Sequence, residues 1–204
     1  MILLLFLIRF SMNWQRKSIS YIYGYQGTGA QLGNSLYQID KSYPEIHKYY
    51  GLLSGLLYTL PFSLGGIFLN FFNTMRFSET NLLCTVVGIA GISSILTGVV
   101  NSFPVLVAMR IVHAICFSMT IPLIATLVHR FIPRDYRGRA NSILYSAYHV
   151  GTAISSLSIL VIGLFGWRNI YNIMGISGII IGALTGIILR KKESKTKKKK
   201  KEGE

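Results

Sequence analysis

The fold is decided by residues 110–151, which read RIVHAICFSMTIPLIATLVHRFIPRDYRGRANSILYSAYHVG. Two apolar spans, one ending at Val128 and the other beginning at Ala140, flank a short basic loop. That loop contains the closely spaced residues Arg134, Asp135, Arg137, Gly138 and Arg139. Short loops on the cytoplasmic side of membrane proteins are rich in Lys and Arg. The stretch therefore predicts a transmembrane helical hairpin whose loop faces the cytoplasm.

Three short motifs follow one another from this hairpin onward. In the first span Arg110 is followed three residues later by His113 and then by a small residue. The loop contains Pro133 and the run Arg-Gly-Arg-Ala at 137–140, and Gly-Trp-Arg at 166–168 precedes a glycine-rich span. In this order and spacing the motifs resemble those of the major facilitator superfamily of transporters.

The resemblance covers nearly all 204 residues, but only the first half of the family's usual twelve helices. It implies an all-α membrane protein with six transmembrane helices, arranged as two three-helix repeats. It also implies transport by alternating access, in which one such half moves against a second. The chain is therefore expected to be part of a secondary carrier.

The resemblance is incomplete in the loop at residues 72–80. The family usually has Gly, then Asp, then paired basic residues there, whereas this sequence has Asn73, Arg76 and Glu79. This departure weakens the expectation of the family's charge-paired gate at that loop.

The composition argues against a soluble domain. Hydrophobic residues make up 51% of the chain and charged residues 14%, against about 25% charged residues in soluble proteins. A net charge of +14 would also suit a nucleic-acid-binding protein. The basic residues, however, flank the apolar spans or gather in the C-terminal tail. They indicate positive-inside topology and attraction to an anionic lipid bilayer, with no nucleic-acid partner.

No pattern in the sequence suggests an enzyme. The two cysteines, Cys84 and Cys116, both fall in apolar spans and have no metal-ligand spacing, so they are expected to behave as small apolar residues. The sequence also lacks a nucleophile triad and a phosphate-binding glycine loop. We therefore expect no metal, no cofactor and no enzymatic activity.

Apolar runs predict the boundaries of the transmembrane region. Spans are expected at about residues 1–23, 49–71, 81–100, 105–128, 140–164 and 169–189, because about 20 residues cross a bilayer. Residues 1–190 then form one six-helix bundle, with an external loop at 24–48. Residues 191–204 are Lys-rich and are expected to form a disordered, polybasic tail. Both termini are expected in the cytosol.

The first span is unusual because it carries Arg9, Arg16 and Lys17. Such charges are too costly to face lipid. Either they face a polar cavity, which we favour, or the chain lacks its true start.

Small residues spaced four apart predict where helices approach closely. One such ridge lies on the second span, another on the fifth with Ala147 and Ser155, and a third on the sixth. The glycines expected at these contacts are Gly51, Gly55, Gly151, Gly178 and Gly182.

A polar stripe follows one face of the fifth span at helical spacing. Its members are Ser142, Tyr145, His149, Thr152 and Ser156. The stripe either lines a polar cavity, or its hydroxyls bond back to their own helix and across to neighbours. The glycine ridge on another face of the same helix would pack against a neighbouring helix.

Arg110 and His113 share a face of the fourth span, and Arg110 is the strongest single signal in the sequence. Its guanidinium either lines a cavity or reaches the external interface by snorkelling. Arg16 lies at a similar depth on the first span, so the two basic residues are expected to flank one site. The full set of cavity candidates is Arg16, Lys17, Arg110, His113, Tyr145, His149 and Thr152.

No Asp or Glu lies in any of the six spans, so a cavity lined by these basic residues should favour an anion. We expect a transporter of a small, anionic organic solute, partnered by the bilayer and by a second six-helix half or a second copy of the chain. The alternative is a truncated, non-transporting membrane protein or an interaction subunit.

Overall fold

The computed structural model describes residues 1–27, 29–74 and 78–202, and every regular element in these ranges is a helix. The long helices are α1 (Ile2–Gly24), α4 (Leu57–Thr74), α5 (Glu79–Val99), α6 (Phe103–Phe131), α7 (Arg137–Phe165) and α8 (Trp167–Glu202). Shorter elements are η1 (Gly29–Gln31), α2 (Ile39–Ser42), α3 (Ile46–Gly51), η2 (Leu52–Leu56) and η3 (Arg134–Tyr136). The predicted all-α class is confirmed.

Five of the helical segments are long and apolar enough to cross a membrane. They are Ile46–Ile67, Glu79–Val99, Phe103–Phe131, Arg134–Phe165 and Trp167–Lys191. The sixth long helix, α1, has 23 residues and a length of about 34 Å, but it also carries three basic residues. Composition alone therefore does not identify α1 as a membrane span. Its position in the bundle is set by the helices that pack against it.

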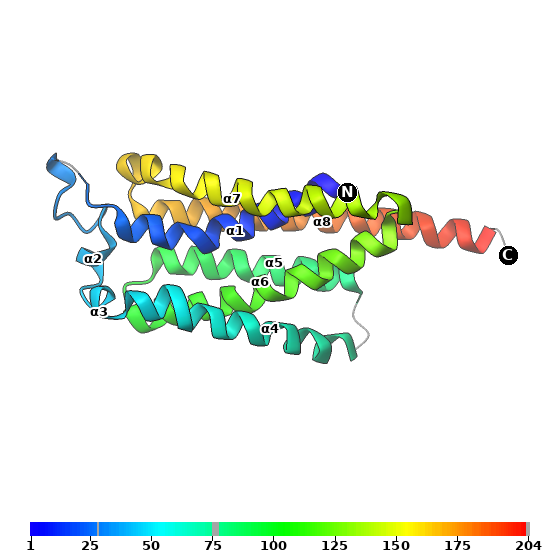
Figure 1. The fold of residues 1–204 in the computed structure, drawn as a ribbon, viewed down its shortest axis with the longest axis horizontal. Helices are drawn as coiled ribbons and strands as arrows, with labels where there is room; N and C mark the ends of the chain where they lie inside the picture. Colours follow the sequence, from blue (N-terminus) through cyan, green and yellow to red (C-terminus); the bar gives the residue numbers. More distant parts are fainter. Residues whose placement is uncertain (28, 75–77, 203–204) are drawn as a thin grey trace.

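The helices pack in a pattern that repeats between the two halves of the chain (Figure 1). α1 packs on α7, α4 on α6, and α5 on α8. In order of the long helices, the first therefore pairs with the fifth, the second with the fourth, and the third with the sixth. Exchanging the first three helices with the last three reproduces the same pairs, as expected for two three-helix repeats.

Both chain ends lie toward the same end of the bundle as the connection between α6 and α7, and the segment with α2 and α3 lies at the opposite end (Figure 1). At the α6–α7 connection Arg137 donates to the carbonyl oxygens of Ile132 and His129, at 3.1 and 2.8 Å. Nearby, Arg130 at the end of α6 forms an ion pair with Glu79 at the start of α5. The arginines at this connection therefore bond with groups at the ends of α5 and α6 and hold these ends in place. Arg76, the remaining charged residue of the loop at 72–80, lies outside the described residues.

Glycines set the closest helix contacts. A Cβ atom placed at Gly91 of α5 would lie 2.6 Å from a side-chain carbon of Ile179 and 2.9 Å from the carbonyl oxygen of Gly175. On α8, a Cβ at Gly182 would lie 2.9 Å from Val87, and one at Gly178 would lie 2.9 Å from the Gln15 amide. The backbones approach closely because these residues lack side chains.

The second span departs from the predicted packing. A Cβ at Gly51 or Gly55 would meet no described atom within 4 Å, so neither glycine packs against another helix in the described structure. The close approach of α4 to α6 falls instead at Gly65, where a Cβ would lie 2.7 Å from Ser118. Thr59 and Ser63, which continue this row of small residues, are exposed as well, so the row faces away from the neighbouring helices.

At the other end of the bundle, residues 166–168 form hydrogen bonds that connect several segments of the chain. Gly166 adopts a φ of 80°, and the next residue, Trp167, donates from its ring to the Ser35 carbonyl oxygen at 3.0 Å. Arg168 donates to the carbonyl oxygens of the three residues 98–100 at 3.1–3.3 Å, which closes the end of α5. These bonds join residues far apart in the sequence, at the start of α8, the end of α5 and the external loop.

The C-terminal tail differs from the prediction. The sequence predicts disorder from residue 191, whereas α8 continues as a helix to Glu202. Lys and Glu are good helix formers, and extending an existing helix requires no new nucleus. The helix therefore continues past the apolar span.

Candidate functional site

Arg110 and His113 lie buried where α6 meets α1. The Arg110 side chain donates from Nη1 to the Gln15 carbonyl oxygen and from Nη2 to the Arg16 carbonyl oxygen, both at 3.1 Å. Only 4% of Arg110 is exposed, so its guanidinium turns into the bundle and does not snorkel to the interface. Its Nε has no hydrogen-bond partner among the described residues.

His113 belongs to a directed chain of hydrogen bonds. The Gln15 amide nitrogen donates to the Met174 carbonyl oxygen at 3.1 Å and to Ser11 Oγ at 3.2 Å. The Gln15 Oε1 is therefore the atom that accepts from His113 Nε2 at 3.1 Å. A proton of His113 must then lie on Nε2, and in the neutral ring Nδ1 accepts from the Tyr58 hydroxyl at 3.1 Å. His113 thus links α1, α4, α6 and α8.

Arg16 and Arg110 both contact the Tyr58 ring. Their guanidinium carbons lie 5.3 and 5.2 Å from its centroid, and Arg16 also lies 5.3 Å from the Phe62 ring. Such contacts offset part of the cost of a cation away from water. Arg16, Arg110 and His113 therefore form one cluster with Tyr58 and Gln15, called the tyrosine cluster below. Within it Gln15, Tyr58, His113 and two nitrogens of Arg110 form hydrogen bonds between helices, whereas Arg16 contacts the cluster through rings.

The other cavity candidates do not join this cluster. Thr152 of α7 accepts from the Asn13 amide of α1 at 2.8 Å and donates to the Tyr148 carbonyl oxygen at 3.0 Å. Gly151 lies at the same contact, where a Cβ would be 2.9 Å from the Phe10 carbonyl oxygen. Thr152 and Gly151 thus lie in the α1–α7 interface. Lys17 is partly buried and has no hydrogen bond or ion pair with a described residue.

The stripe on α7 divides into hydroxyls that bond locally and aromatic residues that do not. Ser142 and Ser156 donate to the carbonyl oxygens of Gly138 and Ala153 in their own helix, at 3.1 and 2.6 Å. Tyr145 and His149 are both exposed, and their rings meet edge to face at a centroid distance of 5.1 Å. The serines therefore have local acceptors, while the aromatic residues leave their polar atoms free.

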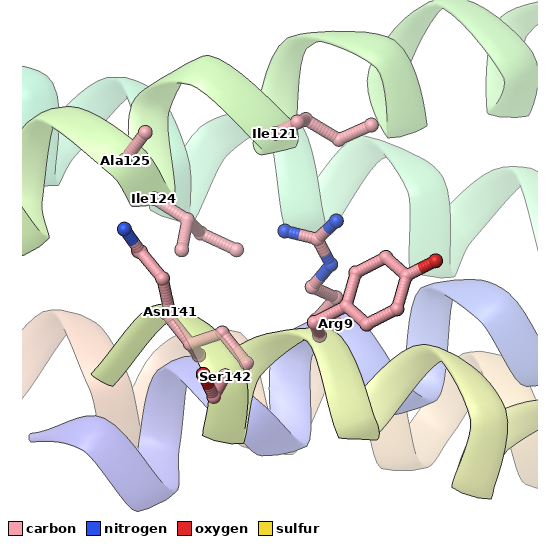
Figure 2. Close-up of a pocket in the computed structure, with 8 residues that line it drawn as sticks. Arg9, Ile121, Ile124, Ala125, Asn141 and Ser142 are labelled. Carbon is pink, nitrogen blue, oxygen red and sulfur yellow. The ribbon is translucent and has the colours of Figure 1, made fainter. Parts of the chain in front are cut away.

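A groove with a cavity volume of about 550 Å³ lies between α1, α6 and α7. It is lined by Arg9, Ile121, Ile124, Ala125, Asn141, Ser142, Leu144 and Tyr145. Figure 2 shows the Arg9 and Asn141 side chains extending toward α6, which contributes Ile121, Ile124 and Ala125 to the facing side. One side of the groove is therefore polar and basic, and the other is apolar.

The list of cavity candidates drawn from the sequence omitted the residues that distinguish these two places, although Arg9 was expected to face a polar cavity. Gln15 and Tyr58 organise the tyrosine cluster, while Arg9 and Asn141 line the groove. Arg9 carried a usable signal, because it is a charge in an apolar run. Asn141 carried none, since an Asn just after a loop is ordinary. Among the described residues, no group of His, Cys, Asp and Glu side chains could hold a metal ion.

Six long helices in two repeats, with a polar groove between three of them, define a multi-pass helical membrane protein of the transporter class. The profile of the Major Facilitator Superfamily matches residues 2–204. The chain therefore belongs to this superfamily. No sequence among curated proteins matches the chain.

Membership establishes the coarse function. The chain is a multi-pass integral membrane protein, and its family carries out facilitator-type membrane transport rather than enzymatic reactions. The tyrosine cluster and the groove are two places in the described structure where polar side chains gather between helices.

Proposed function

We propose that this chain takes part in the transport of a small, anionic organic solute by alternating access. The observation that carries the proposal is the charge of the transmembrane helices. Arg9, Arg16, Lys17 and Arg110 lie well inside long helices, whereas the acidic residues Glu79 and Asp135 lie at the very ends of the spans that contain them. Positive charge without acidic partners favours binding of a negatively charged solute.

We further propose that the chain works against a second six-helix body, either another half or another copy of itself. Only 17% of the apolar part of the second span and 22% of that of α7 are buried, against 61% for α6. These two helices are equivalent in the two repeats, so both repeats leave the corresponding face uncovered. In this superfamily the solute site lies between two halves that rock against each other.

We expect transport to require this pairing. In liposomes, the chain held as a monomer should show no uptake of organic anions above protein-free vesicles. A covalently linked tandem pair, or the chain joined to a second half, should show uptake that saturates with concentration. The measurement is uptake of a radiolabelled carboxylate, with crosslinking to establish the oligomeric state in the same vesicles.

Uptake by a demonstrably monomeric chain would overturn the pairing proposal. Failure of every paired form to move organic anions, while remaining folded, would favour the alternative role of a non-transporting interaction subunit.

We propose that both termini are cytosolic, because Arg130 and residues 134–139 lie at the same end of the bundle as the tail. A single cysteine placed at Ser194, in a chain whose two native cysteines are replaced by serine, should resist a membrane-impermeant maleimide in intact cells. A cysteine at Lys41, at the other end, should react. Labelling at position 194 without permeabilisation would reverse the assigned orientation.

A further inference from the structure

The groove between α1, α6 and α7 contains polar groups that the rest of the structure does not use. Arg9, Asn141 and Tyr145 line it, and none of the three forms a hydrogen bond or ion pair with a described residue. By contrast, Arg110 donates twice to the backbone of α1. The groove is thus a place between helices where several donors from two helices, α1 and α7, are available together.

The available groups are donors that suit an anion. Arg9 offers a permanently charged guanidinium with up to five N–H groups, Asn141 offers an amide NH₂, and Tyr145 offers a hydroxyl. Ser142 is different, because its hydroxyl already donates to the Gly138 carbonyl oxygen at 3.1 Å. A carboxylate or sulfonate would accept hydrogen bonds from the first three groups, and its charge would offset that of the partly buried Arg9.

The opposite side of the groove restricts the rest of the ligand. Ile121, Ile124 and Ala125 come from successive turns of α6, and Leu144 adds a further apolar side chain from α7. These residues offer no hydrogen bond to a second charged group. The volume of about 550 Å³ lies within the range of small-molecule sites. A single cation facing an apolar wall fits one negative charge attached to a hydrophobic body.

We propose that this groove binds an amphipathic organic monoanion, with its anionic head at Arg9, Asn141 and Tyr145 and its apolar body along Ile121 and Ile124 (Figure 2). The assignment rests on the proposed function, because it names the solute class and the place where it binds. It also assigns different roles to the basic residues of the groove and of the tyrosine cluster. Arg9 binds the solute, whereas Arg16 and Arg110 hold helices together in the tyrosine cluster.

Binding can be measured without transport. The purified full-length chain in nanodiscs is equilibrated with 2-naphthoate, which has one carboxylate and an apolar ring system. The matched probes are 2-naphthylmethanol without the charge, 2-naphthylmethylammonium with the opposite charge, and succinate with two charges and no ring. We expect saturable binding of 2-naphthoate alone. Equal binding of the alcohol, or preferred binding of succinate, would overturn the ligand class.

Two variants test the residues. Arg9→Gln should weaken 2-naphthoate binding by at least about tenfold, since it removes a charged donor. Asn141→Asp should weaken it similarly by placing a carboxylate in the groove. This second variant removes no buried group, because Asn141 is exposed. Lys48→Gln, which removes the same charge at the other end of the bundle, should leave binding unchanged. Unaltered binding in Asn141→Asp, with a normal melting temperature, would refute the site.

The two proposals fail in different ways. Arg9-dependent binding without uptake by any paired form would remove the transport proposal and leave the groove assignment standing. Uptake of a monoanion that is indifferent to both Arg9→Gln and Asn141→Asp would support transport and overturn the groove.

Discussion

We expect the Gly91→Leu variant to lose the folded bundle. The Cβ of the new side chain would lie 2.9 Å from the Gly175 carbonyl oxygen and 2.6 Å from Ile179. The first of these is a backbone atom that cannot rotate away, so α5 and α8 would have to separate along their length. Overpacking a core typically costs about 1–3 kcal/mol, and we expect the upper end of that range or more here because a backbone atom is in the way. The expected result is aggregation or loss of the monodisperse peak in detergent size-exclusion chromatography.

The matched control is Gly88→Leu, one helical turn earlier on α5. A Cβ there would meet no described atom within 4 Å, so the added side chain should face lipid. Both variants replace a glycine by leucine in the same helix and raise helix propensity equally. Similar melting temperatures for the two variants would show that α5 and α8 do not pack as described.

The Arg110→Ala variant should be strongly destabilised, even before transport is measured. It removes two hydrogen bonds from a charged donor to the α1 backbone and leaves the space of a buried side chain empty. Hydrogen bonds of charged groups contribute about 1.5–3 kcal/mol each, so we expect the loss of both to cost about 3–6 kcal/mol. Thermal unfolding followed by circular dichroism in detergent should show the change. Arg110→Met should recover the part of the loss that comes from packing.

Lys17→Ala is the control for this prediction, since Lys17 is also a cation within a span but has no hydrogen bond with a described residue. It should retain the parent melting temperature. If Arg110→Ala were as stable as the parent but inactive in paired uptake, Arg110 would belong to the solute site instead of the helix contacts.

The helices were predictable because apolar runs and basic loops are local signals, whereas the pairing of the helices depends on tertiary contacts. The runs on either side of the loop at 129–139 fixed α6 and α7 to within a few residues. The π-helical turn at Leu52–Leu56 was less accessible to sequence reasoning.

The site was harder to predict, because the role of a polar residue inside a membrane depends on which helix faces it. Arg110 fits a cavity or an interface equally well until the position of the Gln15 and Arg16 carbonyl oxygens is known. The same is true of Thr152, whose partner Asn13 is far away in sequence. Helical spacing places residues on one face of a helix, but it does not show whether a neighbour or an open groove lies opposite.

The contacts of α1 have a consequence for biosynthesis. Each Arg or Lys at the centre of a span opposes insertion by about 2.5–3.5 kcal/mol, and α1 carries three such residues. Arg16 contacts rings of α4 and α6, but α7 and α8, which pack most extensively on α1 and bond with Asn13 and Gln15, leave the ribosome last. The first segment to emerge is therefore among the last to be stabilised, and until then it must remain at the translocon or at the membrane surface. A nascent chain halted after Phe131 should leave its N-terminal segment open to added protease, whereas release of the whole chain should protect it.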